Sequence, residues 1–386
     1  MVDSLGVAVI GFGWMGRVHT QAYARVRHHY PRLGLRPELI AVADEAPGRA
    51  AEAQDQYGFL VATTDWRDLA ADPRIQAVSI AAPNFLHREI GSVLAAAGKH
   101  IWIEKPVGLT AGDARAVAAA VRDAGVQGTV GFNYRNVPAV ETARELIATG
   151  ALGAVTHARF RLFSDYAAHP EGALTWRYER ARGGSGVLGD LAGHGADLIR
   201  FLLGEIEELV ADTAIFVPRR ARPAGVTAGH TRAAGGELGP VENEDYVSGQ
   251  LRLVSGARVM LEASRVAVGE QNAYGFEIHG TTGALFWDFR RMGELGVSTG
   301  DAYQDQAVST VVIGPSHGEY AAFQPGAANS MGFDDLKVIE AYRFLRSIEE
   351  GKPYGATLDD AVRSAEVLDA MTESARSRRW VGLPSA

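Results

Sequence analysis

The sequence contains no cysteine, and this absence excludes several kinds of chemistry at once. Disulfide bonds, thiolate metal sites and cysteine nucleophiles all require a thiol, so none of them can operate in this chain. A chain without disulfides also fits the reducing environment of the cytoplasm. We therefore expect a cytoplasmic protein.

Positive charge and long hydrophobic runs are scarce as well. The 38 Lys and Arg residues are outnumbered by 46 Asp and Glu, which gives a formal net charge of −8. Because nucleic-acid binding needs clustered Lys and Arg, we expect no nucleic-acid partner. No apolar run approaches the roughly 20 residues that a membrane span needs, and no basic segment precedes an apolar one near the start. We therefore expect neither a membrane partner nor secretion.

The length favours two domains. A chain of 386 residues is longer than one hydrophobic core usually supports, and its 47% hydrophobic and 22% charged residues are typical of globular proteins. The pattern of elements changes near residue 133, so we expect one domain over residues 1–133 and a second over 134–386.

In the first domain, short apolar runs alternate with helical patterns, which predicts a doubly wound parallel sheet of the Rossmann type. The predicted strands are Val7–Ile10, Leu39–Ala43, Ala77–Ala82, His100–Ile103 and Val126–Val130. The predicted helices are Met15–Val26, Gly48–Tyr57, His87–Ala97 and Ala111–Asp123. Residues 27–37, which contain His28 and His29, are expected to form a solvated loop.

The second domain is predicted to be an α/β domain with a large, mostly antiparallel sheet that is open on one face. Its predicted strands are 155–163, 207–217, 246–253, 257–268, 274–279 and 284–289, and its predicted helices are 139–148, 186–202, 333–349 and 358–377. The glycine-rich segment 219–241 and the segment 314–332 are expected to be long loops, the first of them mobile.

A glycine triplet at the end of the first strand points to dinucleotide binding. Gly11 permits a tight turn, Gly13 lets the backbone approach a pyrophosphate, and Gly16 lets the following helix pack closely on the strand. A chance match is the alternative, because the chain has 45 glycines. The second strand ends in Asp44, whose carboxylate suits ribose hydroxyls and would repel a 2′-phosphate, so NAD is the predicted cofactor. The predicted cofactor residues here are Gly11, Phe12, Gly13, Trp14, Met15, Gly16 and Asp44.

Two more motifs follow strands of the same predicted sheet, at the edge where such sheets bind ligands. AAPNFLH covers Ala81–His87, and IWIEKP covers Ile101–Pro106. The alternatives are a helix cap at Asn84 and a surface ion pair formed by Glu104 and Lys105. The predicted cofactor residues from these motifs are Pro83, Asn84, His87, Glu104 and Lys105.

The helix predicted over Gly186–Leu202 carries the third motif. Asp190 and His194 lie four residues apart, which places them on one helical face, and Asp197 extends the same stripe. A polar stripe of this kind can also be the solvated side of a helix, and that alternative stays open.

Together and in this order, the glycine triplet, PNFLH, EKP and GGSGVLGDLAGH resemble the Gfo/Idh/MocA family of oxidoreductases. The resemblance implies a nucleotide-binding domain joined to an α/β domain whose open sheet mediates homo-oligomer contacts, in a dimer or tetramer. It also implies a sugar or polyol substrate, with Lys105 as the EKP lysine, His194 as the acid/base and Asp190 as a substrate-orienting residue. The segments LTWRYERARGGSGVLGD, FNYR and VENEDYV, together with the long insert 27–37, resemble the levoglucosan and inositol dehydrogenases of the family.

Hydride transfer from a secondary alcohol requires a base for the hydroxyl proton, and a histidine such as His194 can accept it near neutral pH. The ammonium group of Lys105 can stabilise the developing alkoxide. No metal is needed, and no convincing ligand cluster is visible. The predicted catalytic residues are Lys105, Asp190 and His194, and the predicted substrate-binding residues are these three with Asn133, Arg135, Asp165, Trp176 and Arg177.

Two other functions remain open. Some members of the family hydrolyse glycosides by transient oxidation with bound nicotinamide cofactor, and a dinucleotide sensor would need no catalysis at all. The leading expectation is NAD-dependent oxidation of a sugar, an anhydrosugar such as levoglucosan, or an inositol.

Overall fold

The computed structural model describes residues 3–223, 232–233 and 235–384, and the protein divides into two compact units. Unit 1 consists of Met1–Asn133 and Gly332–Arg363, and unit 2 consists of Tyr134–Met331 and Ser364–Ala386. The first stretch of unit 1 ends at Asn133. The chain then returns to unit 1 near its C-terminal end, and helix α9 (Leu358–Ser377) crosses the second division.

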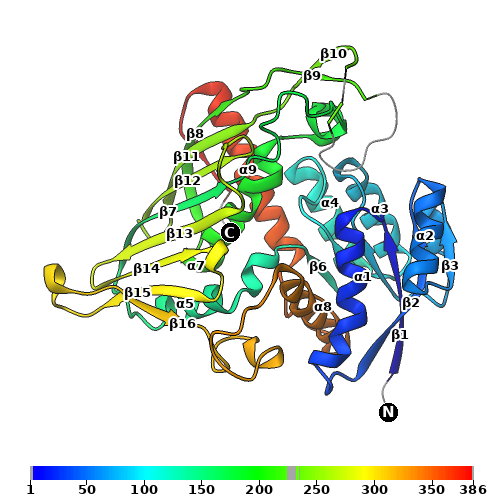
Figure 1. The fold of residues 1–386 in the computed structure, drawn as a ribbon, viewed down its shortest axis with the longest axis horizontal. Coiled ribbons are helices and arrows are strands. Elements are labelled where there is room, and N and C mark those ends of the chain that lie inside the picture. The colour runs from blue at the N-terminus through cyan, green and yellow to red at the C-terminus, as the bar shows by residue number, and fades with distance from the viewer. Residues whose placement is uncertain (1–2, 224–231, 234, 385–386) are drawn as a thin grey trace. The chain divides into compact units, whose positions relative to one another are not determined.

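Unit 1 is built on a six-stranded parallel sheet in the order β3-β2-β1-β4-β5-β6 (Figure 1). This order confirms the predicted doubly wound fold. The strands are β1 (Asp3–Ile10), β2 (Leu35–Ala43), β3 (Val61–Thr63), β4 (Ala77–Ile80), β5 (His100–Ile103) and β6 (Gly128–Val130). The helices are α1 (Trp14–His29), α2 (Pro47–Tyr57), α3 (Asn84–Ala96), α4 (Ala111–Asp123) and α8 (Phe333–Glu350).

Local chemistry explains where these elements begin and end. Strand β4 is buried along its whole length, as expected for a strand covered on both faces. Helix α4 begins after Thr110, whose hydroxyl accepts a hydrogen bond from the Asp113 N–H, and α2 ends at Gly58 in the left-handed conformation with φ of 78°. The sequence analysis missed β3, because this edge strand has three residues and none of them is buried.

Close backbone approach at the glycine triplet fixes the start of α1. Gly11 has φ of 83°, which favours glycine, and it lies against the backbone of Ala81 and Ala82. A Cβ atom on Gly16 would lie 2.1 Å from the carbonyl oxygen of Gly11, so no side chain fits there. A Cβ atom on Gly13 would meet nothing within 4 Å. The fold itself therefore requires glycine at positions 11 and 16, but not at position 13.

Helix α8 lies beside α1 in unit 1, although some 300 residues separate the two in the chain (Figure 1). Arg25 forms an ion pair with Asp335, and the rings of Tyr30 and Tyr342 stack with their centroids 3.7 Å apart. The prediction of a solvated loop over 27–37 is wrong for most of the segment, since α1 continues to His29 and β2 begins at Leu35. Within the segment 27–37 only Tyr30 is buried, and its stacking on Tyr342 of α8 is a contact that the local sequence pattern did not reveal.

Unit 2 contains a nine-stranded sheet in the order β16-β15-β14-β13-β7-β12-β11-β8-β17. Every neighbouring pair is antiparallel except β7 and β12, which are parallel, so the prediction of a mostly antiparallel sheet is confirmed. The strands are β7 (Val155–Phe163), β8 (Ile206–Ala214), β11 (Tyr246–Leu253), β12 (Arg258–Ser264), β13 (Ala273–Gly280), β14 (Gly283–Asp288), β15 (Glu294–Thr299), β16 (Ser309–Val312) and β17 (Val381–Gly382).

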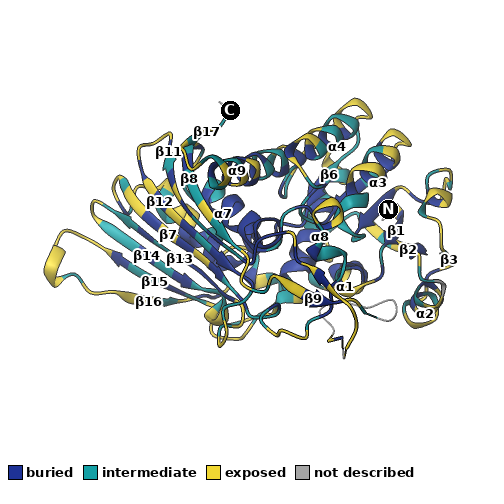
Figure 2. Cartoon of the chain, turned by 90° about the horizontal axis from the view of Figure 1, so that it is seen from above, coloured by how far each residue is buried: buried dark blue, intermediate teal, exposed yellow. Residues whose placement is uncertain are grey.

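One face of this sheet is packed and the other is open. Helices α5 (Pro138–Ala148) and α7 (Gly193–Leu203) pack on the covered face. Burial alternates along the strands, as Figure 2 shows. On β7, Phe160 and Leu162 are buried, whereas Arg159 and Arg161 between and beside them are exposed. The period of two predicted from the sequence is confirmed.

The two predicted long loops contain short ordered elements. Within 219–241, strands β9 (Arg219–Ala221) and β10 (Leu238–Pro240) form an antiparallel pair, and residues 224–231 and 234, on which the prediction of mobility largely rests, lie outside the described residues. The segment 314–332 includes one short 3-10 helix, Tyr320–Ala322. Among the described residues, no helix has both the length and the apolar character to cross a membrane.

We predict that Gly16→Ala destabilises the protein, because the new methyl group would overlap the carbonyl oxygen of Gly11. Overpacking of this kind costs about 1–3 kcal/mol of unfolding free energy. Gly13→Ala is the matched control, since its Cβ meets no atom. Chemical denaturation of both variants without cofactor measures the difference. Equal stability of the two variants would contradict this account of the loop.

Candidate active site

The start of α1 has the features of a phosphate-binding site. Helix α1 begins at Trp14, and no side chain caps its N-terminus at Gly13. The first N–H groups of a helix lack intrahelical partners and attract anions. Trp14 is 68% exposed, and its indole stacks on the ring of Phe333 with centroids 5.2 Å apart. The predicted cofactor loop therefore offers backbone donors, open space at Gly13 and an exposed aromatic surface.

Asp44 is buried at the carboxyl end of β2 and holds the glycine loop in place. One carboxylate oxygen accepts a hydrogen bond from the Phe12 N–H at 2.7 Å, and the other accepts one from the Ala46 N–H at 2.9 Å. The guanidinium of Arg49 approaches both oxygens at 3.3 Å. This carboxylate lies where a Rossmann domain recognises the adenosine ribose, and the open Gly13 and the uncapped helix suit a pyrophosphate. The residues present thus fit a dinucleotide.

The PNFLH motif supports the EKP turn through His87. The imidazole of His87 is buried, which lowers its pKa, and its ring nitrogens lie 2.8 Å from the Pro106 carbonyl oxygen and 2.7 Å from that of Ala82. Both nitrogens therefore contact backbone, and the side chain connects two turns at the ligand edge of the sheet. Asn84 is the first residue of α3 and provides no side-chain cap, so the capping alternative is wrong.

Glu104 is buried rather than paired at the surface. Its carboxylate lies 2.9 Å from His19 Nε2 and 2.6 Å from Lys337 Nζ, and it also accepts a hydrogen bond from the backbone N–H of Lys105 at 3.3 Å. Burial alone would raise the pKa of Glu104, but Lys337 and His19 together hold it well below its usual range. The surface ion pair considered for Glu104 and Lys105 is therefore excluded.

In unit 2, Asp190 lies in a π-helical turn instead of the continuous α-helix predicted over 186–202. Residues Leu188–Ala192 form this turn, and α7 follows from Gly193. Helix α7 packs close to the sheet at Gly195. A Cβ at this position would lie 2.5 Å from Leu261 and 2.8 Å from Leu162, so the close packing favours glycine. Single π-turns inside helices occur frequently at functional sites.

Tyrosines surround Asp190. The hydroxyl of Tyr166 donates a hydrogen bond to the Asp190 carboxylate, and burial together with this negative charge raises the pKa of Tyr166 well above its usual value. Burial, and then the charge of Asp190, also raises the pKa of Tyr274. Both phenols therefore stay protonated at neutral pH and can act as hydrogen-bond donors.

His194 is 7% exposed and packs against aromatic rings. The ring of Tyr134 meets that of His194 edge to face, with centroids 4.7 Å apart, and also contacts Tyr274 and Phe289. An edge-to-face contact fixes the plane of the imidazole. The solvated-face alternative for this helix is wrong, because Asp197 is also buried, at 1% exposed.

Arg135, a predicted substrate residue, forms a buried bidentate ion pair with Asp197. Its Nε lies 2.7 Å from one carboxylate oxygen and its second guanidinium nitrogen 2.5 Å from the other. The guanidinium also lies over the ring of Phe201, 4.9 Å from its centroid. These contacts attach the segment around Tyr134 to α7 and give Arg135 a structural task.

The remaining predicted substrate residues lie in both units. Asn133 is 2% exposed in unit 1, and its side-chain nitrogen has no hydrogen-bond partner within the described part of the chain. Asp165 accepts a hydrogen bond from Gln271, and Arg177 stacks on Trp176, 4.4 Å from the ring centroid. These last contacts all lie within unit 2.

The segment VENEDYV forms a buried frame below the π-turn. Glu244 accepts hydrogen bonds from the N–H groups of Gly186 at 2.7 Å and Leu188 at 3.1 Å. Arg265 pairs with Asp245 at 2.8 Å and also donates to the Asn243 side chain at 3.0 Å. The frame thereby fixes the start of the segment that carries Asp190.

The sequence analysis missed Tyr134, Tyr166 and Tyr274 as candidate site residues. Tyr134 stands inside the FNYR segment, and Tyr166 follows the predicted Asp165, so proximity to named residues was the available signal. Tyr274 lies on β13 and offers no motif. Only the three-dimensional contacts with Asp190 and His194 identify these residues.

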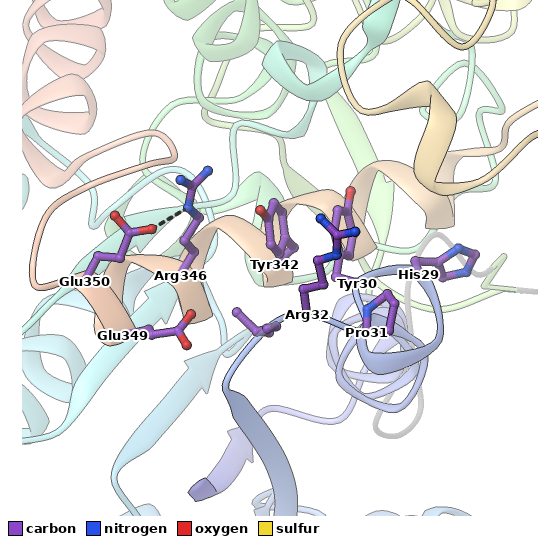
Figure 3. A pocket seen from close by; sticks show the side chains of 9 residues that line it. His29, Tyr30, Pro31, Arg32, Tyr342, Arg346, Glu349 and Glu350 are labelled. Carbon is purple, nitrogen blue, oxygen red and sulfur yellow. Dashed lines mark hydrogen bonds and ion pairs between the residues drawn. The ribbon is translucent and has the colours of Figure 1, made fainter. Parts of the chain in front are cut away.

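Unit 1 has a cavity of about 400 Å³. Figure 3 shows its labelled side chains, including Tyr30, Arg32 and Tyr342, and the ion pair between Arg346 and Glu350. None of the predicted catalytic or binding residues lines it.

Three residues of unit 1 could form a metal-ligand set. Single ligand atoms of His19, Glu104 and Glu340 lie within 4.8 Å of one another. Lys337, however, contacts both carboxylates, at 2.6 Å and 2.9 Å, so its ammonium already supplies the positive charge that a metal ion would bring.

We predict that Asp44→Ser reduces discrimination against NADP, because it removes the negative charge that would repel a 2′-phosphate. The ratio of kcat/KM for NADP to that for NAD should rise at least about 10-fold, an effect of about 1.4 kcal/mol. Glu45→Gln is the control, since it removes the neighbouring exposed charge. An equal change in the control would show that general electrostatics, rather than Asp44, sets the preference.

Comparison with known proteins gives matches along the whole chain. Residues 5–132 match the family model "Oxidoreductase family, NAD-binding Rossmann fold", and residues 140–286 match the model "GFO/IDH/MocA C-terminal domain". The levoglucosan dehydrogenase of Pseudarthrobacter phenanthrenivorans is 37% identical over 386 residues, which cover 99% of each chain. The inositol 2-dehydrogenase of Rhizobium meliloti is 28% identical, covering 97% of this chain and 98% of the other. A solved levoglucosan dehydrogenase in complex with NADH and levoglucosan has a TM-score of 0.93 at 36% identity, covering 99% of this chain and 100% of the other.

Proposed function

This chain belongs to the GFO/IDH/MocA family of oxidoreductases, and from that premise we propose that it oxidises a secondary hydroxyl group of levoglucosan or a similar anhydrosugar to a ketone. It is an NAD-dependent dehydrogenase of sugars or polyols. The observation that carries the finer proposal is the 37% identity with a levoglucosan dehydrogenase along the full length of both chains.

The cofactor would be held by residues of unit 1. The N–H groups at the start of α1 and the open backbone at Gly13 suit the pyrophosphate, and Asp44 suits the adenosine ribose. The bound nicotinamide supplies the hydride acceptor. We assign the turns around Asn84 and Lys105, which His87 connects, to the nicotinamide end.

We assign the proton chemistry to Lys105, Asp190 and His194. His194 accepts the hydroxyl proton, and the ring of Tyr134 fixes the plane of the imidazole for that transfer. The ammonium of Lys105 stabilises the developing alkoxide. Asp190, held by the Tyr166 hydroxyl, orients the substrate through a hydrogen bond. Asn133, Asp165, Trp176 and Arg177 are the proposed further contacts to the sugar.

We also propose that the protein is a cytoplasmic homo-oligomer that assembles through the open face of the nine-stranded sheet. The support is the alternating burial of its strands, which leaves one broad face without covering helices in the described structure. The absence of cysteine agrees with the proposed compartment.

The substrate proposal is tested by following NADH absorbance with levoglucosan, inositols and aldoses as substrates. We predict that levoglucosan gives the highest kcat/KM, and that NADH accumulates in step with a keto product. An inositol preferred by about 10-fold or more would replace levoglucosan as the substrate. Sugar release without NADH accumulation would identify a hydrolase instead, and tight NADH binding with no turnover of any polyol would identify a sensor.

His194→Ala should slow turnover by about 100-fold to 10000-fold while leaving NADH affinity nearly intact, because it removes a positioned base. Lys105→Ala should cause a similar loss, and the effects of the two should not add, since both are proposed to act on one hydroxyl group. His28→Ala, an exposed histidine at the end of α1, is the control. Near wild-type turnover in His194→Ala would remove this histidine from the mechanism.

A further inference from the structure

We infer that Lys337 is a positioning residue for Lys105, acting through the buried carboxylate of Glu104. The inference rests on the proposed function, because it takes Lys105 as the lysine that contacts the reacting hydroxyl. Lys337 itself lies on α8, more than 200 residues after Glu104 in the chain. It belongs to none of the sequence motifs that resemble the family.

The geometry places an ammonium between two carboxylates in the interior of unit 1. Lys337 Nζ lies 2.6 Å from Glu104 Oε1 and 2.9 Å from Glu340 Oε1. All three residues are buried, and Lys337 is 1% exposed. The indole N–H of Trp102 donates to Glu340 Oε1 at 2.6 Å. We call these three charged residues together with His19 the buried charge cluster.

His19 connects the buried charge cluster to the glycine loop. It lies on α1 one turn after Gly16, stacks on Trp102 with centroids 3.6 Å apart, and meets Glu104 Oε1 through Nε2 at 2.9 Å. Burial lowers the pKa of His19 to about 4, so the ring is neutral near pH 7. A neutral ring facing a carboxylate carries its proton on Nε2, and Nδ1 then has no partner within the described structure.

The buried charge cluster contains more carboxylates than cations. Two carboxylates face one ammonium and a neutral histidine, and burial raises the pKa of Glu340 to about 7. Lys337 and His19 keep Glu104 ionised, so the strongest pair is that of Lys337 with Glu104. A buried ion pair is not an efficient source of stability, since well-packed hydrophobic residues often do as well. Its place beside the EKP turn points instead to control of local geometry.

Glu104 connects Lys337 to Lys105, because its carboxylate contacts both residues. Glu104 Oε2 accepts a hydrogen bond from the backbone N–H of Lys105 at 3.3 Å. Gly131 also packs against this carboxylate, since a Cβ there would come within 2.6 Å of it. Beyond Lys105, His87 contacts the Pro106 carbonyl oxygen at 2.8 Å. The backbone on both sides of Lys105 is therefore held by buried groups, and Lys337 fixes the first of them.

The test is a double-mutant cycle of Lys337→Met with Lys105→Ala. Lys337→Met should lower kcat by about 10-fold to 100-fold, the range found when a hydrogen-bond partner of a metal ligand is removed, and leave NADH affinity within about threefold. In the Lys105→Ala background, the same substitution should lower kcat by less than about twofold, because its effect passes through Lys105. Equal losses in both backgrounds would overturn the inference.

Lys99→Met is the matched control. Lys99 is also a buried lysine of unit 1, but among the described residues it donates only to the carbonyl oxygens of Asp72 and Ile75, both at 2.8 Å. We expect Lys99→Met to lower the melting temperature while keeping kcat within about twofold. If Lys99→Met lowers kcat as much as Lys337→Met, the effect of Lys337 is one of general stability and the inference fails.

Hydrogen exchange supplies a readout that needs neither substrate nor cofactor. In the protein without cofactor, amide exchange over residues 100–109 should accelerate at least about 10-fold in Lys337→Met and stay unchanged in Lys99→Met. If Lys337→Met does not fold, Glu104→Gln replaces it, since the amide keeps the size and weakens the pairing. Unchanged exchange in this segment overturns the inference. Faster exchange together with no oxidation of any polyol by the wild type would instead count against the proposed function alone.

Discussion

Unit 1 depends on one steric constraint, which is that no side chain fits between β1 and the start of α1. Gly16 lies so close to the Gly11 carbonyl that the helix must begin at the carboxyl end of β1. This start directs the next turn of α1 inward, where His19 stacks on Trp102 of β5. The contact between Gly16 and Gly11 therefore positions both the backbone proposed to bind phosphate and a side chain in the interior of unit 1.

Much of the fold could be predicted, because strand and helix periodicity are local properties of the sequence. The missed elements either have few buried residues or depend on partners far along the chain. Strand β3 is an unburied edge strand, and β15 and β16 extend the edge of the large sheet with few buried residues. The insert 27–37 is ordered beside α8, from the other end of the chain. No local pattern contains that information.

The candidate site was predicted in part, for a related reason. Motifs identify Lys105, Asp190 and His194, but polar residues are expected at the surface unless a partner is known. Asp197 can be buried because Arg135 forms an ion pair with it. Glu104 can be buried because Lys337 and His19 both contact its carboxylate. The π-turn at Leu188–Ala192 and the tyrosines around Asp190 depend on packing against the sheet, which a helical wheel cannot express.

The return of the chain to unit 1 has a consequence for biosynthesis. Helix α8 covers α1 and supplies Lys337, yet the ribosome makes it only after eight of the nine strands of the large sheet, all except β17. Until then the emerging N-terminal unit lacks a covering helix and carries Glu104 without its ammonium partner. Domains normally fold as they leave the ribosome, N-terminal first. Here unit 1 waits for Gly332–Arg363 and unit 2 for Ser364–Ala386. The nascent chain therefore carries an unfinished Rossmann unit through most of its synthesis.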